Sequence, residues 1–138
     1  MIIDGKNLIL GRASSYIAKQ ALLGESIDVI NCEQMFISGS KMDIFDKYLH
    51  KKTEMGTYKK GPFWPRRPDM FVKKTIRGML PYKFPKGKAA LKRIMFHIGS
   101  PEGLKGKPET IKFALVDKIP NLKYIQIGEV CKRLGWQN

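Results

Sequence analysis

The chain has 138 residues, which predicts a single domain whose hydrophobic core needs no disulfides. Hydrophobic residues make up 43% of the sequence and charged residues 28%, a balance that indicates a globular protein and excludes a disordered one. The net charge of +14 is larger than solubility requires, and it indicates a polyanionic partner such as RNA, DNA or an acidic membrane surface.

Signals for export and for membrane insertion are missing from the sequence pattern. The chain opens without a basic segment followed by an apolar one, so we expect no secretory signal. No apolar run approaches the roughly 20 residues that cross a bilayer, so we expect no membrane span. Cys32 and Cys131 lie far apart in the sequence, which suits neither a disulfide framework nor a zinc site and is typical of a reducing compartment.

The beginning of the chain predicts a strand, a helix and a second strand. Residues 1–4 are a short apolar run that ends at a turn signal, and residues 27–31 are a second apolar run. Between them, residues 11–23 place apolar side chains on one helical face, and Gly24 stands where a helix C-cap belongs. This βαβ unit predicts parallel strands joined by a right-handed crossover.

The next segment predicts a third strand and a second helix. Residues 35–37 form a short apolar run. Ser40, followed three residues later by Asp43, resembles a capping box that begins a helix reaching about Glu54. Glycines and prolines then recur through residues 56–68, which predicts a loop.

Two more helices and a strand follow this loop. Pro68 can occupy the first turn of a helix over residues 68–80, and Pro85 opens another helix through Arg93. Residues 95–99 are apolar and end at a glycine, which predicts a further strand.

The last part of the chain predicts an extended arm and a terminal helix. From residue 99 to about 124, Gly, Pro and Lys recur without a lasting period, whereas residues 127–134 predict a short helix. We therefore expect a single domain. Its α/β core covers residues 1–99 and includes a basic helix-loop insertion at 56–93, and the arm with its terminal helix covers residues 100–138.

The positive charge is concentrated in the middle of the chain. Residues 41–95 hold 16 basic and 4 acidic side chains, whereas residues 1–40 hold 3 and 4, and residues 96–138 hold 7 and 4. A charge that served only solubility would be spread more evenly. The concentration therefore favours a binding surface.

The basic side chains gather on and around the predicted helix 68–80. At about 100° per residue, Lys73, Lys74 and Arg77 share one face, and apolar residues occupy the opposite face. Considered alone, this basic face is explained equally well as an ordinary solvent-exposed helix surface or as a binding surface. The basic loops on either side favour contact with RNA or DNA phosphates. The candidate nucleic-acid-binding residues of this segment are Lys59, Lys60, Arg66, Arg67, Lys73, Lys74, Arg77, Lys83, Lys86 and Lys88.

Four aromatic residues, Tyr58, Phe63, Trp64 and Tyr82, lie among these basic residues. If they are exposed, they can stack on bases or sugars. Alternatively, Phe63 and Trp64 pin the loop to the core. We favour the second interpretation for this pair, because prolines bracket both residues.

Catalytic signals are weak. The two histidines are His50, on a basic helix, and His97, in an apolar strand where a hydrogen-bonded structural role is the more ordinary one. No glycine-rich nucleotide-binding motif and no Cys/His cluster is present in the sequence. An RNA-modifying or other RNA-acting enzyme on an α/β scaffold stays an alternative, as does a free DNA-binding or membrane-surface protein, although the helix 68–80 needs its apolar face for the core.

Several segments resemble the universal large-subunit ribosomal protein thirteen family. The most specific run is Thr75-Ile76-Arg77-Gly78-Met79-Leu80-Pro81-Tyr82-Lys83, which looks like the archaeal and eukaryotic form of the family. The resemblance covers nearly the whole chain and is weakest over residues 100–123. The other matching segments are 4–15, 29–33, 37–39, 61–69, 86–93 and 127–136.

The resemblance implies a three-layer α/β/α core with a four-stranded, mainly parallel sheet. It implies a protein that is not an enzyme, has no cofactor, metal or small-molecule substrate, and lies in the cytoplasm within the large ribosomal subunit. There it would bind large-subunit rRNA early in assembly, beside neighbouring ribosomal proteins and away from membranes. Arg12, which the family motif matches, joins the candidate RNA-binding residues on this basis.

Overall fold

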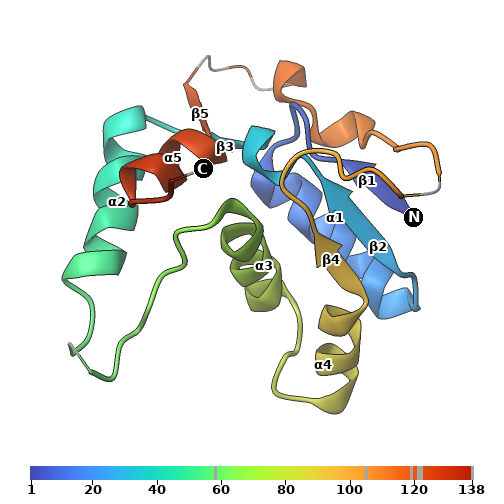
Figure 1. Cartoon of the computed structure of the whole chain (residues 1–138), viewed down its shortest axis with the longest axis horizontal. Coiled ribbons are helices and arrows are strands. Elements are labelled where there is room, and N and C mark those ends of the chain that lie inside the picture. Colours follow the sequence, from blue (N-terminus) through green and yellow to red (C-terminus); the bar gives the residue numbers. More distant parts are fainter. Residues whose placement is uncertain (58, 105, 119, 121–122, 138) are drawn as a thin grey trace.

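The computed structural model describes residues 1–57, 59–104, 106–118, 120 and 123–137, and Figure 1 shows the whole chain. The structure is mixed α/β. Its strands are β1 (Ile2–Asp4), β2 (Ile27–Ile30), β3 (Phe36–Ser38), β4 (Ile94–Phe96) and β5 (Tyr124–Gln126). Its helices are α1 (Leu10–Leu23), α2 (Lys41–Thr53), α3 (Pro68–Met79), α4 (Pro85–Lys92) and α5 (Ile127–Arg133).

The main sheet is parallel and has the order β1-β2-β4. Ile3, Val29 and Phe96 are in register across it, and Ile3 and Val29 are fully buried. The predicted β-helix-β unit is thereby confirmed. Its helix α1 ends at Gly24, whose φ of 112° is the left-handed conformation that glycine adopts without steric cost.

The helices of the core lie on one face of this sheet. The chain moves in one direction across the sheet, from β1 to β2 to β4, and crossovers of one hand in one direction put their helices on the same face. Accordingly, α1 packs against both α3 and α4, while Met95 on the other face is exposed. The predicted helical layers on both faces therefore do not match the described residues.

The predicted four-stranded sheet is also different in the structure. The segment predicted at 35–37 forms β3, but β3 pairs antiparallel with β5 in a separate sheet, with Ile37 opposite Ile125. Within the main sheet, β2 has β1 on one side and β4 on the other. The outer edge of β1 is taken by Glu109, whose N–H donates to Ile2 O at 2.8 Å and whose carbonyl oxygen accepts from Asp4 N at 3.0 Å.

The arm expected after residue 99 lies along the core. Ile111, Ala114 and Val116 are buried, and Ala114 O accepts a hydrogen bond from Ile9 N at 2.7 Å. The arm contains two short 3₁₀ turns and β5, which the weak local pattern did not predict. The terminal helix was predicted correctly as α5, and it lies beside α2 (Figure 1).

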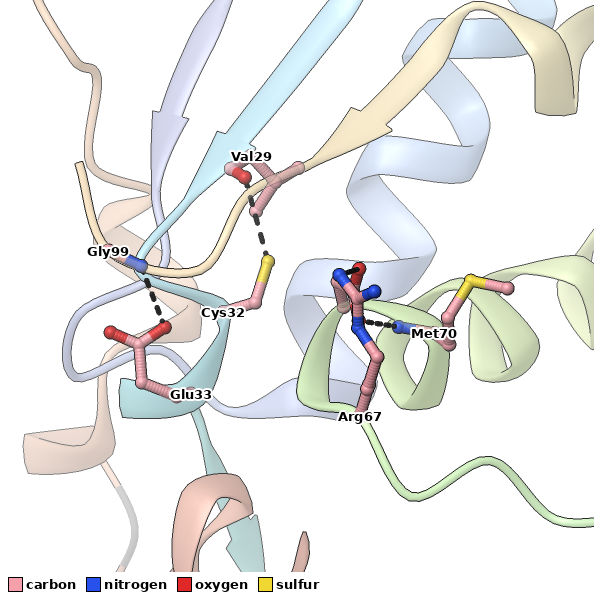
Figure 2. A network of polar contacts seen from close by, with 7 residues as sticks. Val29, Cys32, Glu33, Arg67, Met70 and Gly99 are labelled. Carbon is pink, nitrogen blue, oxygen red and sulfur yellow. Dashed lines mark hydrogen bonds and ion pairs between the residues drawn. The ribbon is translucent and has the colours of Figure 1, made fainter. Parts of the chain in front are cut away.

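Polar contacts fasten the turn that follows β2. In Figure 2, a carboxylate oxygen of Glu33 accepts a hydrogen bond from Gly99 N at 3.1 Å, and Cys32 Sγ donates to Val29 O at 3.5 Å. The Glu33 contact holds the turn against the chain that leaves β4, and the Cys32 contact holds it to β2. No helix among the described residues has the length and apolar character that a membrane crossing requires.

Candidate nucleic-acid interface

Five of the eleven predicted binding residues meet in one groove between α3, α4 and the loop that precedes α3. The groove has a volume of about 760 Å³. Its cations are Lys73, Lys74, Arg77, Lys83 and Lys88, and its other lining residues are Phe63, Pro65, Met70, Tyr82 and Leu91. Cations thus lie beside aromatic and aliphatic side chains in a single depression.

The sequence of α3 explains why its cations face this groove. Pro68 occupies the first turn, and Met70 N, one of the N–H groups at the helix start, donates to the Asp69 carboxylate at 2.8 Å. Phe71, Val72 and Ile76 are buried against the core. Because the basic residues occupy the opposite side of the same helix, packing of the apolar face turns Lys73 and Arg77 outward.

Lys74 has structural contacts of its own. Its ammonium group donates to Phe63 O at 2.6 Å and lies 4.2 Å from the ring centroid of Trp64. Burial lowers the pKa of Lys74, and repulsion from Arg77 and Lys51 lowers it further. Lys74 therefore fastens the loop to α3, in addition to contributing charge to the groove.

The two aromatic residues of the loop, Phe63 and Trp64, have different environments. Trp64 packs against Tyr48 and Phe71, with ring centroids 5.4 Å and 5.7 Å away, so the expected pinning of the loop is confirmed for Trp64. For Phe63 it is wrong, because the Phe63 side chain is 70% exposed and lines the groove. Successive side chains of an extended segment point in opposite directions, so one ring of the pair enters the core and the other leaves it.

Two glycines shape the walls of the groove. Gly61 has a φ of 74°, and a Cβ there would lie 2.9 Å from Phe63 N and from the Phe63 ring. Gly87 is buried in α4, and a Cβ there would lie 2.1 Å from Pro81 O. The missing side chains let Phe63 turn outward and let α4 approach the turn that carries Tyr82 and Lys83.

The remaining predicted residues lie outside this groove. Arg67 forms an ion pair with Asp69 at 2.8 Å, which Figure 2 shows at the start of α3. Arg66 lies beside Gly135, and Lys86 lines a separate hollow together with residues of α1. Arg12, Lys59 and Lys60 are exposed and do not line the groove. Tyr58 falls outside the described residues.

The sequence analysis missed three residues of this region. Lys51 of α2 lies 4.8 Å from the Trp64 ring centroid, and burial lowers its pKa, as does its neighbour Lys47. Met70 and Leu91 supply apolar lining to the groove. Lys51 could have been found from its spacing to Tyr48, which places both side chains on one helical face. No local pattern in the sequence identified Met70 or Leu91 as groove residues.

Of the two histidines, His97 has the hydrogen-bonded structural role that its apolar surroundings predicted, and His50 lies on the surface. His97 is half-buried, and its Nε2 lies 3.1 Å from Asp28 Oδ1. His50 is exposed and contacts Glu54 on the same helix. Within the described ranges, no group of three or more His, Cys, Asp or Glu residues is placed to hold a metal ion.

Comparisons with known proteins identify the family. The family model of Ribosomal protein L13 matches residues 1–103. The large ribosomal subunit protein uL13 of Methanopyrus kandleri is 41% identical over 139 residues, which cover 99% of this chain and 87% of the relative. Those of Archaeoglobus fulgidus and Methanococcus maripaludis are 42% and 41% identical over 138 residues. These alignments cover 99% and 98% of this chain, and 88% and 97% of the relatives. Because the match extends along nearly all of its length, this chain belongs to the Ribosomal protein L13 family.

Proposed function

We propose that this chain is a structural component of the large ribosomal subunit that binds large-subunit rRNA and supports early assembly of the subunit. Its family consists of ribosomal proteins and not of enzymes. The relatives are named as large-subunit proteins, and the proposal transfers that place to this chain. In the assembled particle, its neighbours would be rRNA and other ribosomal proteins.

The observation that carries the proposal is the groove between α3 and α4. It gathers five cations, and the side chains of Lys73, Lys83 and Lys88 have no hydrogen bond or ion pair to another described residue. Such ammonium groups can approach phosphates, and release of the counterions condensed on RNA supplies the affinity. The exposed Arg12, Lys59, Lys60, Arg66 and Lys86 lie outside the groove, and we propose that they add phosphate contacts at other places on the surface.

The arm and the core would act as one domain in this role. One hydrophobic cluster includes Ile3 and Val29 of the main sheet, Ile111 of the arm and Val130 of α5. We propose that this shared core keeps the cations at constant spacing. A rigid arrangement of charges binds a folded RNA with less loss of conformational entropy than a flexible tail.

A matched pair of triple variants tests the proposed surface. Replacing Lys73, Lys83 and Lys88 with Gln should weaken binding to large-subunit rRNA in a filter-binding titration. It should also reduce the slope of log affinity against log salt by roughly 0.9 for each lost phosphate contact, or ~0.7 on single strands. The control replaces the exposed Lys112, Lys118 and Lys123, which changes the net charge equally outside the groove. Equal losses in both variants would contradict the placement of the surface.

Sedimentation of a native cell extract tests the cellular role. We expect this chain at stoichiometric amounts in the large-subunit fraction of a sucrose gradient, and retained there after a moderate-salt wash. Recovery at the top of the gradient would overturn the proposal.

A further inference from the structure

Phe63 presents a large apolar surface to solvent. Its side chain is 70% exposed, although a phenylalanine ring gains free energy from burial. The ring also lines the groove that holds the five cations. Met70 and Tyr82 are also exposed and line the same groove, and an exposed apolar patch with charged residues around it indicates a contact surface.

The structure holds Phe63 in this position. Lys74 donates to the Phe63 carbonyl oxygen at 2.6 Å, and Trp64, the next residue, is anchored against Phe71. Gly61 has a positive φ and no Cβ, and a Cβ at this position would collide with the Phe63 ring. The ring is therefore presented by a fixed backbone, and a ligand that stacks on it need not first order the loop.

The groove has further apolar and aromatic lining. Tyr82 is 37% exposed, and the guanidinium carbon of Arg77 lies 4.5 Å from its ring centroid. Met70 and Leu91 also line the groove, so that apolar side chains separate the cations. This combination differs from a purely cationic phosphate-binding surface.

Duplex RNA and unpaired RNA present different chemical groups to such a groove. An A-form duplex keeps its bases stacked inside and offers phosphates and 2′-hydroxyls, which would leave the aromatic and apolar lining without a partner. An unpaired nucleotide offers a flat π face together with its phosphate. A groove of about 760 Å³ is within the size range of pockets that enclose small ligands.

We propose that this groove binds an unpaired nucleotide of RNA, whose base stacks on Phe63 while the adjoining phosphates lie against Lys73, Lys83 and Lys88. The inference rests on the proposed function and adds the class of RNA structure that the groove recognises.

The test uses the full chain and a single-stranded RNA of mixed sequence and roughly 10 nucleotides. The RNA carries one fluorescent adenine analogue, whose emission falls when it stacks. The same strand annealed to its complement provides the duplex. We expect tighter binding of the single strand than of the duplex, with quenching of the analogue. Phe63→Ala should weaken single-strand binding by roughly fivefold to a hundredfold and abolish the quenching, whereas Phe63→Trp should preserve both.

Phe84→Ala is the matched control, because Phe84 is 67% exposed and does not line the groove. It should bind as the unsubstituted chain does. Preference for the duplex, or unchanged binding by Phe63→Ala, would overturn the inference.

If the inference failed in this way but the triple lysine variant still lost rRNA affinity, the proposed function would stand without the inference. If a Glu-rich peptide containing one phenylalanine bound through Phe63 and the single strand did not, the groove would be a protein-docking site and the inference would be wrong.

Discussion

At the scale of single residues, the cations of the groove have different roles. Lys74 is held by the Phe63 carbonyl oxygen and the Trp64 ring, whereas Lys73 and Lys88 make no such contacts among the described residues. Burial lowers the pKa of Lys74 in the folded protein, so its charge opposes folding. That penalty is present below the folded pKa and is relieved as the pH rises through it. Lys74 is therefore a positioning residue, and its neighbours are better placed to meet phosphates.

Ser14 is a second residue whose environment predicts a measurable effect. It is fully buried in α1, and its hydroxyl oxygen has no hydrogen-bond partner among the described residues. Ser14→Ala should raise the free energy of unfolding by about 1 kcal/mol in a denaturant titration, because it removes an unpaired buried polar group. Ser15→Ala is the control, since it gains the same helix propensity at the next, exposed position and removes only the solvent-exposed hydrogen bond that Ser15 Oγ donates to Arg12 O at 2.8 Å. A Ser14→Ala variant no more stable than Ser15→Ala would contradict this account.

The two buried thiols predict a dependence of stability on pH. Burial raises the pKa of Cys32 and of Cys131 from 9.0 to about 12. Above pH 9 the unfolded chain loses these protons while the folded chain keeps them, so the free energy of unfolding falls as the pH rises. Each thiol should contribute a slope of roughly 1.4 kcal/mol per pH unit well above its unfolded pKa.

Denaturant titrations between pH 8 and pH 10 measure this slope. Cys32→Ala should show a shallower fall than the unsubstituted chain, whatever its absolute stability. Because the two proteins differ only at residue 32, the difference between their slopes isolates the thiol. An unchanged slope would show that Cys32 does not resist ionisation in the folded state.

At the scale of elements, the groove depends on how closely α4 approaches the turn after α3. Pro85 begins α4, and the buried Gly87 lies against the carbonyl of Pro81. This contact brings Lys88 of α4 near Lys83 and Tyr82 at the rim of the groove. The geometry of the binding surface therefore rests on a helix contact that permits no side chain.

Substitution of two helical glycines tests this contact. Gly87→Ala should lower the free energy of unfolding by about 1–3 kcal/mol and weaken rRNA binding, because the new methyl group overlaps the backbone at Pro81. Gly78→Ala in α3 meets no atom within 4 Å and should raise the free energy of unfolding by up to about 1 kcal/mol through helix propensity. Thermal unfolding of both variants provides the comparison. Equal effects would indicate that the close approach at Gly87 has no energetic role.

At the scale of the whole molecule, the positive charge destabilises the free protein and stabilises the proposed complex with RNA. The net charge is +14, and the segment 41–95 alone holds 16 basic side chains. Like charges gathered on one region repel each other in the absence of a polyanion. In a complex with RNA, the phosphates attract these basic side chains, and this attraction outweighs the repulsion between them.

Salt should therefore act in opposite directions on the two states. Raising ionic strength to about 0.1 M, where the Debye length is ~10 Å, should raise the Tm of the free chain by screening this repulsion. The same change should weaken the rRNA complex through counterion release. Calorimetry of the free chain and a binding titration in the same buffers measure the two trends. A Tm that falls with added salt would show that ion pairs, and not repulsion, dominate the free protein.

Much of the local structure was predictable from the sequence. All five α-helices of the described residues were predicted near their observed bounds, because apolar periodicity and flanking Gly or Pro are local properties of the chain. The strands at 1–4, 27–31 and 35–37 were predicted for the same reason. β5 was missed, because three residues with one buried side chain carry too short a pattern. The concentration of positive charge in the middle of the chain also followed from residue order alone.

The tertiary structure decided which of these parts meet. Pairing of β3 with β5 joins segments that are far apart in the chain, so it is a property of the assembled fold. Lys86 and Lys88 are two residues apart and were predicted together, yet a helix rotates about 100° per residue, so they face nearly opposite directions. Packing of α4 through Gly87 puts Lys88 in the groove and Lys86 beside α1. Sequence by itself determined the elements and the charge, whereas long-range packing determined which cations share a surface, because orientation is decided by contacts between residues distant in the chain.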